Sequence, residues 1–420
     1  MATIEHGVGS GASFALSDEQ KGLRELAREF AEKEIRPKAA EYDEHQTHPA
    51  DVVAKAHELG LMNLHVPESL GGLGLSTFDG ILVGEELNWG CSGIGTSIGA
   101  NGLGSMDGAI LGEELCWGCS GIGTSIVANI LGALPVLIAG TDEQQREWLP
   151  PLLEEPILCS FALTEPNAGS DVSGIQTTAV RRGDEYVLNG SKMFITNAGQ
   201  ASWVIVFAST DKDAGHRGLS AFIVPTALDG VVVEKHLDKM GQRATDTSAL
   251  AFQDVVVPAA NRLGEEGQGF KIAMQTLDNT RPGTAAGAVG VARAAFEHSV
   301  AYARERVQFG QPIAMNQGVN FLVADMAAEI EAARLLTWQA AWLLDQGKRA
   351  TLQSSYAKRF AADTAMKVTT DAVQIFGGYG YIKEYPVEKL MRDAKLFQIY
   401  EGTSQIQRLV IAREIFLPRD

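Results

Sequence analysis

The sequence has no long apolar run and no excess of basic residues. No stretch reaches the ~18 consecutive apolar residues that a membrane-spanning helix needs. The 52 acidic residues outnumber the 35 basic ones, which gives a formal net charge of −17. Because proteins that bind nucleic acid need a basic surface, this balance argues against nucleic acid as the main partner. We therefore expect no membrane anchor and no nucleic-acid partner, whereas a few local Arg and Lys residues can still hold a small anionic ligand.

Cysteine is scarce, and its four positions (Cys91, Cys116, Cys119 and Cys159) favour a reducing compartment. Cys116 and Cys119 form a C-x-x-C pattern, but zinc would need a second ligand pair and a redox site would follow a strand. We therefore predict no metal site. Residues 1–16 are Gly/Ser-rich and lack the apolar core of a secretory signal. They are expected to be a disordered lead-in to a cytoplasmic protein, although a mature mitochondrial-matrix protein would look the same.

Common catalytic signatures are also missing. No G-x-G-x-x-G joins a predicted strand to a helix, so a dinucleotide would not bind in Rossmann fashion. The sequence contains no G-x-x-x-x-G-K phosphate loop and no H-E-x-x-H zinc motif, and no predicted strand runs through a G-x-S-x-G turn into a helix as in a serine-hydrolase elbow. His45 and His48 are better explained by a polar loop between helices than by a metal site.

The pattern of apolar residues divides the chain into three parts, as its 420 residues require more than one hydrophobic core. Residues 17–156 have helical periodicity, and residues 157–266 contain short β-rich runs with a hairpin signal around Arg181–Asp184. Residues 267–420 return to long helical segments. The predicted fold is a multidomain α+β chain with an N-terminal helical domain, a middle antiparallel β-barrel or sandwich, and a C-terminal four-helix bundle. The bundle helices are expected at about 270–306, 317–346, 352–376 and 386–413, with a break at Glu401.

An internal repeat lies in the N-terminal part. Gly84–Ile98 recurs as Gly112–Ile126 with one difference, Asn88 against Cys116. Two copies are too few for a solenoid, and nothing chemical changes between them. We interpret residues 84–111 and 112–139 as a tandem duplication, and we expect a protein that lacks one copy to fold.

Glu401 is the strongest candidate for a catalytic residue. It lies in the run Tyr400–Ser404, on a glycine-containing turn between two predicted helices. A carboxylate on such a turn can face a pocket and remove a proton from a bound substrate. The alternative is a solvent-exposed acid at the start of a helix, where it suits the helix dipole.

Four loops suit a flat ligand that carries phosphate. In the first loop, after the first β-rich run, small residues expose backbone N–H groups. In the second, an aromatic residue precedes a hydroxyl residue at the end of another β-rich run. The third begins with an arginine at the end of a long predicted helix, and the fourth has three glycines at the end of a helix. Each also has an ordinary alternative: a β-turn, a half-buried strand end, a solvated arginine and a helix cap. Together with the carboxylate of Glu401, these loops favour a flavin enzyme that removes an acidified proton from a C–H group. The loops are Thr164–Asp171, Phe194–Asn197, Arg306–Gly310 and Gln374–Gly380.

Over about residues 17–415 the sequence resembles the acyl-CoA dehydrogenases, most closely their medium- and short-chain branches. The resemblance implies that Glu401 takes the α-proton of an acyl-CoA thioester while the β-hydrogen leaves as hydride to FAD, giving a trans-2-enoyl-CoA. It implies that the Glu401 N–H and a flavin ribityl hydroxyl bind the thioester oxygen. It also implies electron transfer to an electron-transfer flavoprotein. The runs that carry it are Leu163–Asp171, Asp278–Arg281, Gln374–Gly378, Arg392–Lys395 and Ile399–Arg408.

The same resemblance implies the residues that bind cofactor and substrate. Some of the FAD contacts, from Arg306 to Phe309 and Gln374 to Gly378, would be supplied across subunits, so a homotetramer is implied. The implied substrate contacts are Ser170, Asp278, Arg281 and Gly402. The implied FAD contacts are Phe161, Leu163, Thr164, Ser170, Phe194, Thr196, Arg306, Gln308, Phe309, Gln317, Gln374, Gly377, Gly378, Thr403 and Gln405.

The sequence departs from the family pattern at a few positions. Phe194 stands where many members have Trp, and Gln308 where Thr is frequent. The isovaleryl and long-chain branches place their base at the position of Thr280, which is not an acid, so Glu401 is the base that the resemblance supports. An acyl-CoA oxidase remains an alternative, although such chains usually add another helical domain. A non-catalytic scaffold is a second alternative, against which the net charge and the intact Glu401 motif argue.

Overall fold

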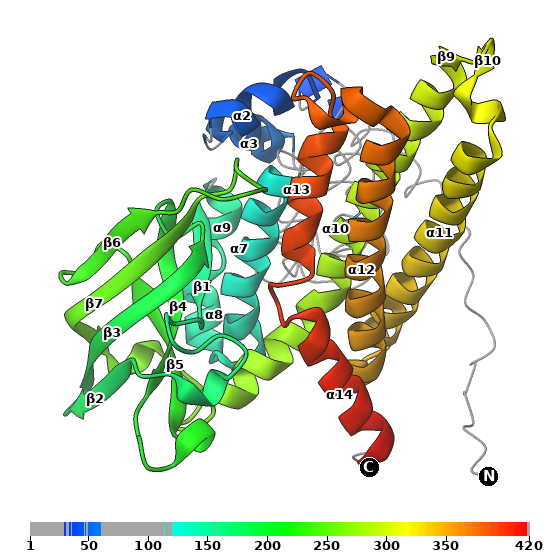
Figure 1. Ribbon diagram of the computed structural model, residues 1–420. Coiled ribbons are helices and arrows are strands. Elements are labelled where there is room, and N and C mark those ends of the chain that lie inside the picture. Colours follow the sequence, from blue (N-terminus) through cyan, green and yellow to red (C-terminus); the bar gives the residue numbers. More distant parts are fainter. Residues whose placement is uncertain are drawn as a thin grey trace.

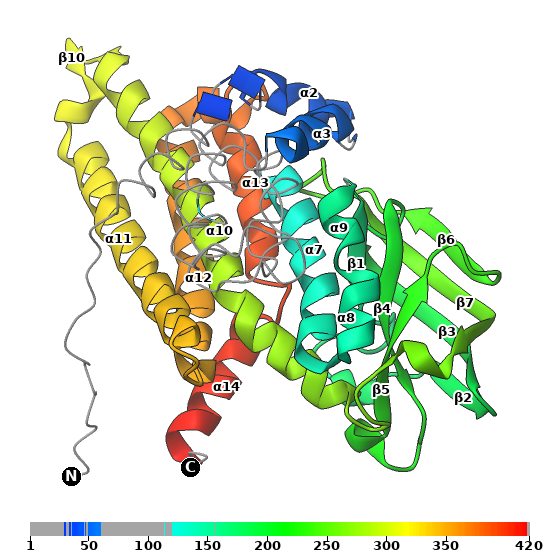
Figure 2. The same ribbon diagram turned by 180° about the vertical axis from the view of Figure 1, so that it is seen from behind.

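The computed structural model describes residues 29–30, 33–34, 36–45, 47, 49–59, 113, 120–155 and 157–417. In this part of the chain a β-sheet lies on one side and a bundle of long helices on the other, with helix α7 between them (Figures 1 and 2). The predicted lead-in 1–16, the C-x-x-C pattern, His48 and the first repeat copy lie outside the described residues.

Helix α7 (Ser120–Ala139) belongs to the second repeat copy and joins the sheet to the bundle. Gly132 lets it approach β1 closely, because a Cβ built there would lie 2.6 Å from Cys159 Sγ. Helix α8 then starts with a capping box between Thr141 and Gln144. No helix in the described ranges is long and apolar enough to cross a membrane. The other N-terminal elements are η2 (Arg36–Lys38), α2 (Ala39–His45), α3 (Ala50–Glu58), α8 (Asp142–Trp148) and α9 (Pro151–Glu154).

The middle domain is an eight-stranded sheet with the order β6-β7-β3-β2-β4-β5-β8, and β1 pairs with β4. Strand β4 is buried on both faces. Trp203, Ile205 and Phe207 face α7 and α10, whereas the alternate residues face the interior of the curved sheet. All the β-rich runs predicted from the sequence are strands. Their bounds are β1 Leu158–Ala162, β2 Thr178–Arg182, β3 Glu185–Thr196, β4 Ala201–Ser209, β5 Leu219–Pro225, β6 Val231–His236, β7 Thr247–Pro258 and β8 Arg262–Leu263.

The expectation of a purely antiparallel sheet is corrected at β4, which pairs in parallel with β1 and β2. A parallel neighbour needs a connection long enough to return the chain to the same end of the sheet. The β2–β3 hairpin and its loops provide that length between β1 and β4. Short 3-10 helices in this domain are η4 (Val172–Gly174), η5 (Gly215–Gly218) and η6 (Ala259–Asn261).

The C-terminal domain is the predicted four-helix bundle, and its helices lie close to their predicted bounds. Alanine dominates the buried faces of α10 and α12, which allows these helices to pack closely. The expected break at Glu401 separates α13 from α14. A small hairpin, β9–β10, projects at the end of the bundle far from the sheet (Figure 1). The elements are α10 Gly269–Glu305, β9 Val307–Gln308, β10 Gln311–Pro312, η7 Ile313–Met315, α11 Gln317–Asp345, α12 Thr351–Phe376, η8 Gly377–Tyr381, α13 Val387–Phe397 and α14 Ser404–Phe416.

Candidate active site

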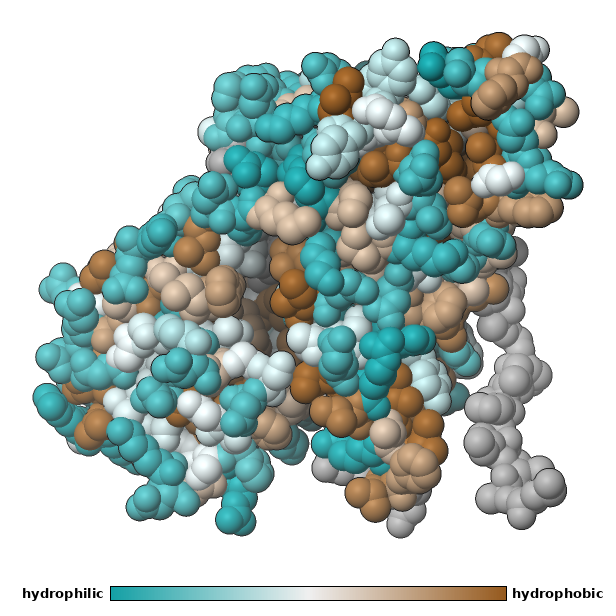
Figure 3. All heavy atoms as spheres, viewed as in Figure 1, coloured by the Kyte–Doolittle hydropathy of each residue, from teal (hydrophilic) through white to brown (hydrophobic). Residues whose placement is uncertain are grey.

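A cavity of about 230 Å³ lies between the sheet and the bundle. The space-filling view shows the hollow there, with apolar residues on its walls (Figure 3). One wall comes from the loop after β1 and the end of β3. The other comes from α10 and the turn between α13 and α14, and Leu131 of α7 contributes between them. Segments far apart in the sequence therefore meet at one site.

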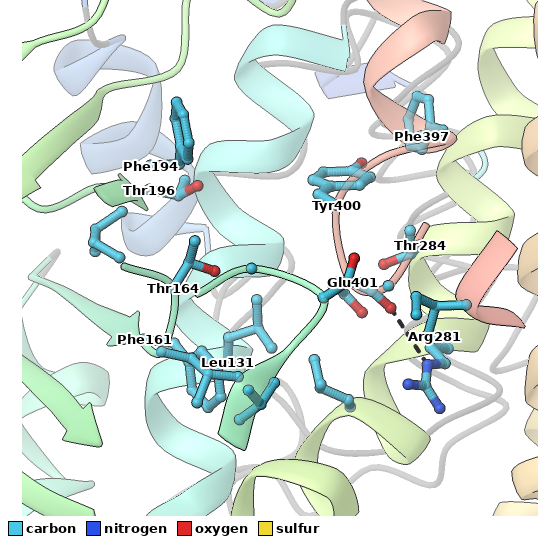
Figure 4. Close-up of a pocket in the computed structure, with 18 of the residues that line it drawn as sticks. Leu131, Phe161, Thr164, Phe194, Thr196, Arg281, Thr284, Phe397, Tyr400 and Glu401 are labelled. Atoms are coloured by element: carbon cyan, nitrogen blue, oxygen red, sulfur yellow. Dashed lines mark hydrogen bonds between the residues drawn. The ribbon is translucent and has the colours of Figure 1, made fainter. Parts of the chain in front are cut away.

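Glu401 lines this cavity from the turn that joins α13 to α14. Its φ of 53° and that of Gly402, 92°, are both left-handed, and this reversal carries the carboxylate toward α10. The Thr280 hydroxyl on α10 donates a hydrogen bond of 2.8 Å to Glu401 Oε2. Thr284, one turn further along α10, also faces Glu401 in the cavity (Figure 4). The first alternative considered for Glu401, a solvated acid at a helix start, does not fit this environment.

The environment of Glu401 makes it a stronger base than an ordinary carboxylate. Burial raises its pKa because the charged form loses its hydration. The hydroxyls of Thr284 and Thr280 and the charges of Lys358 and Arg281 oppose this rise without cancelling it. A carboxylate with a raised pKa holds a proton more tightly and is better suited to accept one from carbon.

The backbone of the turn is held by side chains from three helices. The Glu401 carbonyl accepts from Arg281 Nε at 3.4 Å and from Gln407 Nε2 at 3.2 Å. The Gly402 carbonyl accepts from Lys358 Nζ at 2.6 Å and from Gln407 Nε2 at 3.1 Å. By contrast, no described residue accepts a hydrogen bond from the Glu401 N–H. That N–H remains able to donate to a ligand in the cavity.

The opposite wall carries the aromatic and hydroxyl groups predicted to bind a flat ring. The β-domain residues predicted to contact FAD all line the cavity: Phe161, Leu163, Thr164, Ser170, Phe194 and Thr196. The Phe194 ring is 64% exposed, and its backbone φ of 61° is unusual for an aromatic residue. An exposed ring beside the hydroxyls of Thr164 and Thr196 fits an isoalloxazine ring, and these residues lie across the cavity from Glu401 (Figure 4).

A buried ion pair fixes the loop that carries Thr164. Lys192 Nζ donates to Glu165 Oε1 at 2.8 Å and to the Leu163 carbonyl at 3.2 Å. The two oxygens of Glu165 also accept from the Gln176 and Thr177 amides. Burial would raise the pKa of Glu165, but Lys192 and these donors hold it below its ordinary value. Burial lowers the pKa of Lys192 to about 8. The buried Glu165–Lys192 pair thus holds the loop that carries Thr164 in place.

The predicted substrate contacts on α10 lie beside Glu401. Arg281 is buried, lines the cavity and donates to Asp278 Oδ1 at 2.6 Å. The second oxygen of Asp278 accepts from Thr351 at 2.7 Å. Of the other predicted contacts, Ser170 and Gly402 also line the cavity. The structure therefore brings Arg281, Ser170 and Gly402 to one site, with Asp278 behind Arg281.

The remaining predicted FAD contacts do not line this cavity. Arg306, Gln308, Gly377 and Gly378 line a separate groove at the far end of the bundle, where the Phe309 ring is 96% exposed. Thr403 accepts a hydrogen bond from the Ile406 N–H and caps α14. Gln405 and Gln374 are exposed on their helices, and Gln317 begins α11. Arg306, Gln308, Gly377 and Gly378 thus line a groove that is separate from the Glu401 cavity, whereas Thr403 follows Glu401 on the same turn.

The sequence analysis missed three residues that surround the Glu401 turn: Lys358, Gln407 and Thr284. Lys358 had a detectable signal. It falls in the buried series Ser354, Lys358, Ala361 and Ala365 of α12, where a predicted bundle helix should carry only small or apolar residues. A lysine at such a position indicates either a buried ion pair or a functional charge.

Comparisons with known proteins agree along the whole chain. Family models described as the C-terminal and middle domains of acyl-CoA dehydrogenase match residues 267–416 and 160–255. The N-terminal domain model matches twice, over residues 17–105 and 96–156, and the two matches meet at the internal repeat.

Three relatives illustrate the similarity. A short-chain specific acyl-CoA dehydrogenase of Clostridium acetobutylicum is 43% identical over 96% of this chain and 99% of its own. The structure of butyryl-CoA dehydrogenase from Megasphaera elsdenii is 43% identical, with a TM-score of 0.86 over 96% of this chain and 99% of that one. A chain from a structural study of the electron transferring flavoprotein of Acidaminococcus fermentans is also 43% identical, with a TM-score of 0.86 over 96% of this chain and 100% of that one.

Proposed function

Because this chain belongs to the acyl-CoA dehydrogenase family, we propose that it oxidises a short-chain acyl-CoA thioester to the trans-2-enoyl-CoA with Glu401 as the base. The protein is an acyl-CoA dehydrogenase, a flavoprotein oxidoreductase that acts on a CH–CH bond. One observation carries the assignment of the site. The Glu401 carboxylate faces, across a single cavity, the wall formed by Thr164, Phe194 and Thr196.

The residues around Glu401 can perform the proton abstraction. The α-proton of a thioester is too weakly acidic for a free carboxylate, so the charge that develops on the thioester oxygen needs fixed donors. We assign one donor to the Glu401 N–H, since no described residue uses it. The same residue then supplies the base and part of the oxyanion site. A bound acyl chain excludes water from the cavity, which strengthens both interactions.

FAD is the cofactor that this site would hold. When bound, the flavin accepts the β-hydrogen of the substrate as a hydride. Thr164, Ser170 and Thr196 would hydrogen-bond the flavin, and Phe194 would stack against it. Glu165 and Lys192 would keep the Thr164 loop in place. Phe161 and Leu163 would form the apolar floor beneath the ring.

The names of two relatives support a short acyl chain. The large side chains of Leu131, Met274 and Phe397 are among those that line the cavity. The Clostridium relative is short-chain specific, and the Megasphaera structure is a butyryl-CoA dehydrogenase. The Acidaminococcus relative comes from a study of an electron transferring flavoprotein, which supports such a protein as the electron acceptor.

A homotetramer would explain the predicted FAD contacts that lie far from the cavity. Four of these residues line a groove separate from the Glu401 cavity, and the fifth, Phe309, is exposed: Arg306, Gln308, Gly377 and Gly378 form the groove. In a symmetric assembly they would complete the FAD site of a second subunit. Light scattering of the purified protein and of Phe309→Asp tests this assignment, since the variant should dissociate and lose FAD.

Anaerobic titration of the purified protein tests the proposed function. We expect flavin absorbance that bleaches on addition of butyryl-CoA, and an enoyl-CoA product in stoichiometric amount. Glu401→Gln should retain the flavin absorbance and lose the bleaching. Protein without flavin absorbance would favour a scaffold, and peroxide formation with air as the sole acceptor would favour an oxidase. Bleaching by long-chain but not by short-chain substrates would overturn the proposed chain length.

A further inference from the structure

Lys358 of α12 is a buried cation that the proposed mechanism does not use. Its side chain is 0% exposed, and its ammonium donates to the Gly402 carbonyl at 2.6 Å. A lysine buried in a helical bundle usually pairs with a carboxylate, because an unpaired buried charge is costly. Among the described residues, however, no carboxylate lies within ion-pair distance of Lys358. A carbonyl on the Glu401 turn is its hydrogen-bond partner instead.

The turn that Lys358 binds is one that needs external support. A non-glycine residue in the left-handed region costs on the order of 1–3 kcal/mol unless its surroundings hold it there. Glu401 is such a residue, and Gly402 follows it with a second positive φ. Lys358 from α12 and Gln407 from α14 both donate to the Gly402 carbonyl. Arg281 from α10 donates to the Glu401 carbonyl, so the turn is fixed from three sides.

Lys358 also acts on Glu401 through its charge. The charged groups that face Lys358 are Glu401 on the turn, Arg281 on α10 and Asp363 on its own helix. Burial raises the pKa of Glu401, and the Lys358 charge opposes that rise. An uncharged donor such as glutamine could bind the Gly402 carbonyl without the cost of burying an ammonium. The ammonium supplies a charge that acts on Glu401 in addition to its hydrogen bond to the turn.

We propose that Lys358 is a positioning residue for Glu401, which fixes the backbone turn that carries the base and keeps its carboxylate ionised in the closed cavity. This inference rests on the proposed role of Glu401. Burial lowers the pKa of Lys358 itself to about 7, against the attraction of Glu401 and Asp363. The charge is therefore half present at about pH 7 and grows as the pH falls, toward the range in which less of Glu401 is ionised.

Two variants of matched length separate the hydrogen bond from the charge. Lys358→Met removes both, whereas Lys358→Gln keeps a donor for the Gly402 carbonyl and removes only the charge. The primary measurement is the titration of the Glu401 carboxyl by infrared difference spectroscopy of the purified flavoprotein, with the band assigned by its loss in Glu401→Gln. We expect both variants to titrate at higher pH than the parent protein. A rise of one pKa unit would lower the rate of flavin reduction about tenfold on the acid side.

The dependence of kcat on pH should show the same shift as the titration of Glu401. In Lys358→Gln we expect kcat with butyryl-CoA to fall below neutral pH while KM changes little, and the loss should shrink above about pH 8, where the parent lysine is itself neutral. An unchanged Glu401 titration in Lys358→Gln would overturn the proposal, even if the variant were less stable. If Lys358→Met does not fold, Lys358→Gln decides alone, and if neither folds with flavin bound, the lysine is structural and the proposal fails. Failure of Glu401 itself would show separately, as normal bleaching in Glu401→Gln.

Discussion

The Thr280 hydroxyl donates a 2.8 Å hydrogen bond to the Glu401 carboxylate, across 121 positions of sequence. Such a bond stabilises the ionised form of a carboxylate and therefore lowers its pKa. Thr280 is buried on α10, so water cannot replace its hydroxyl. The helix that follows the β domain thus tunes a base located near the end of the chain.

Removal of this hydroxyl should lower the activity at low pH, because less of Glu401 is then ionised. Thr280→Val preserves the shape of the side chain and removes the donor, which should raise the pKa of Glu401 by about one unit if the bond contributes roughly 1.5 kcal/mol. The acid limb of kcat against pH should then move to higher pH by the same amount. Stopped-flow reduction of the flavin by butyryl-CoA measures the shift. Thr280→Ser keeps the hydroxyl and is the matched control, and an equal shift in both variants would contradict the assignment.

The raised pKa of Glu401 predicts the pH dependence of the parent enzyme. Burial raises this pKa above the ordinary carboxyl value of about 4.3, and only the ionised base can accept a proton. As pH falls through the raised pKa, kcat/KM should fall about tenfold per pH unit. A pH profile with butyryl-CoA and an artificial electron acceptor measures the midpoint. The residual activity of Glu401→Gln should be lower by at least about a hundredfold and should lack this limb; a limb that persists would identify another group as the base.

The Glu165–Lys192 pair should matter more to stability than its single ionic contact suggests. Both side chains are buried, and removal of one partner leaves an uncompensated charge. Lys192→Met is therefore expected to lower the free energy of unfolding by about 3–5 kcal/mol. It should also weaken flavin retention, since Glu165 anchors the loop that carries Thr164. Urea unfolding and flavin content measure the two effects.

Two controls belong to the Lys192 experiment. Lys212→Met alters an exposed lysine and should change stability by no more than about 0.5 kcal/mol. The double variant Glu165→Gln/Lys192→Met removes both charges and should be more stable than Lys192→Met alone. If the double variant were as unstable as the single one, packing rather than the unpaired charge would explain the loss.

The sequence predicted the fold and the β-domain wall of the site better than it predicted the contacts around Glu401. Apolar periodicity located the bundle helices and strands. Thr164 and Phe194 line one cavity because Thr164 follows β1 and Phe194 lies near the end of β3, in the same sheet. The sequence could not reveal that Lys358 and Gln407 donate hydrogen bonds to the backbone of the Glu401 turn. Those contacts depend on how α12 and α14 pack, which local patterns do not encode. The parallel pairing of β4 was missed for the same reason, since it depends on chain topology rather than on composition.

The two repeat copies should differ in what they contribute, although most of their residues match. Asn129 and Gly132 dock α7 against β1, and the first copy carries the same residue types at Asn101 and Gly104. The copies match less well from Gly99 and Val127 onward. Pro135 and Val136 are buried in α7, whereas the corresponding residues of the first copy are Asp107 and Gly108.

Deletion of residues 84–111 should therefore leave a stable flavoprotein, because it retains the whole of α7. Deletion of 112–139 would place an aspartate and a glycine at the buried positions of Pro135 and Val136. The lost side chain alone should cost about 2–5 kcal/mol, and the buried acid adds to that cost. Thermal unfolding and flavin content of the two proteins measure the difference. Equal stability would show that α7 tolerates either sequence, and unfolding of the 84–111 deletion would show that the first copy is part of the structure.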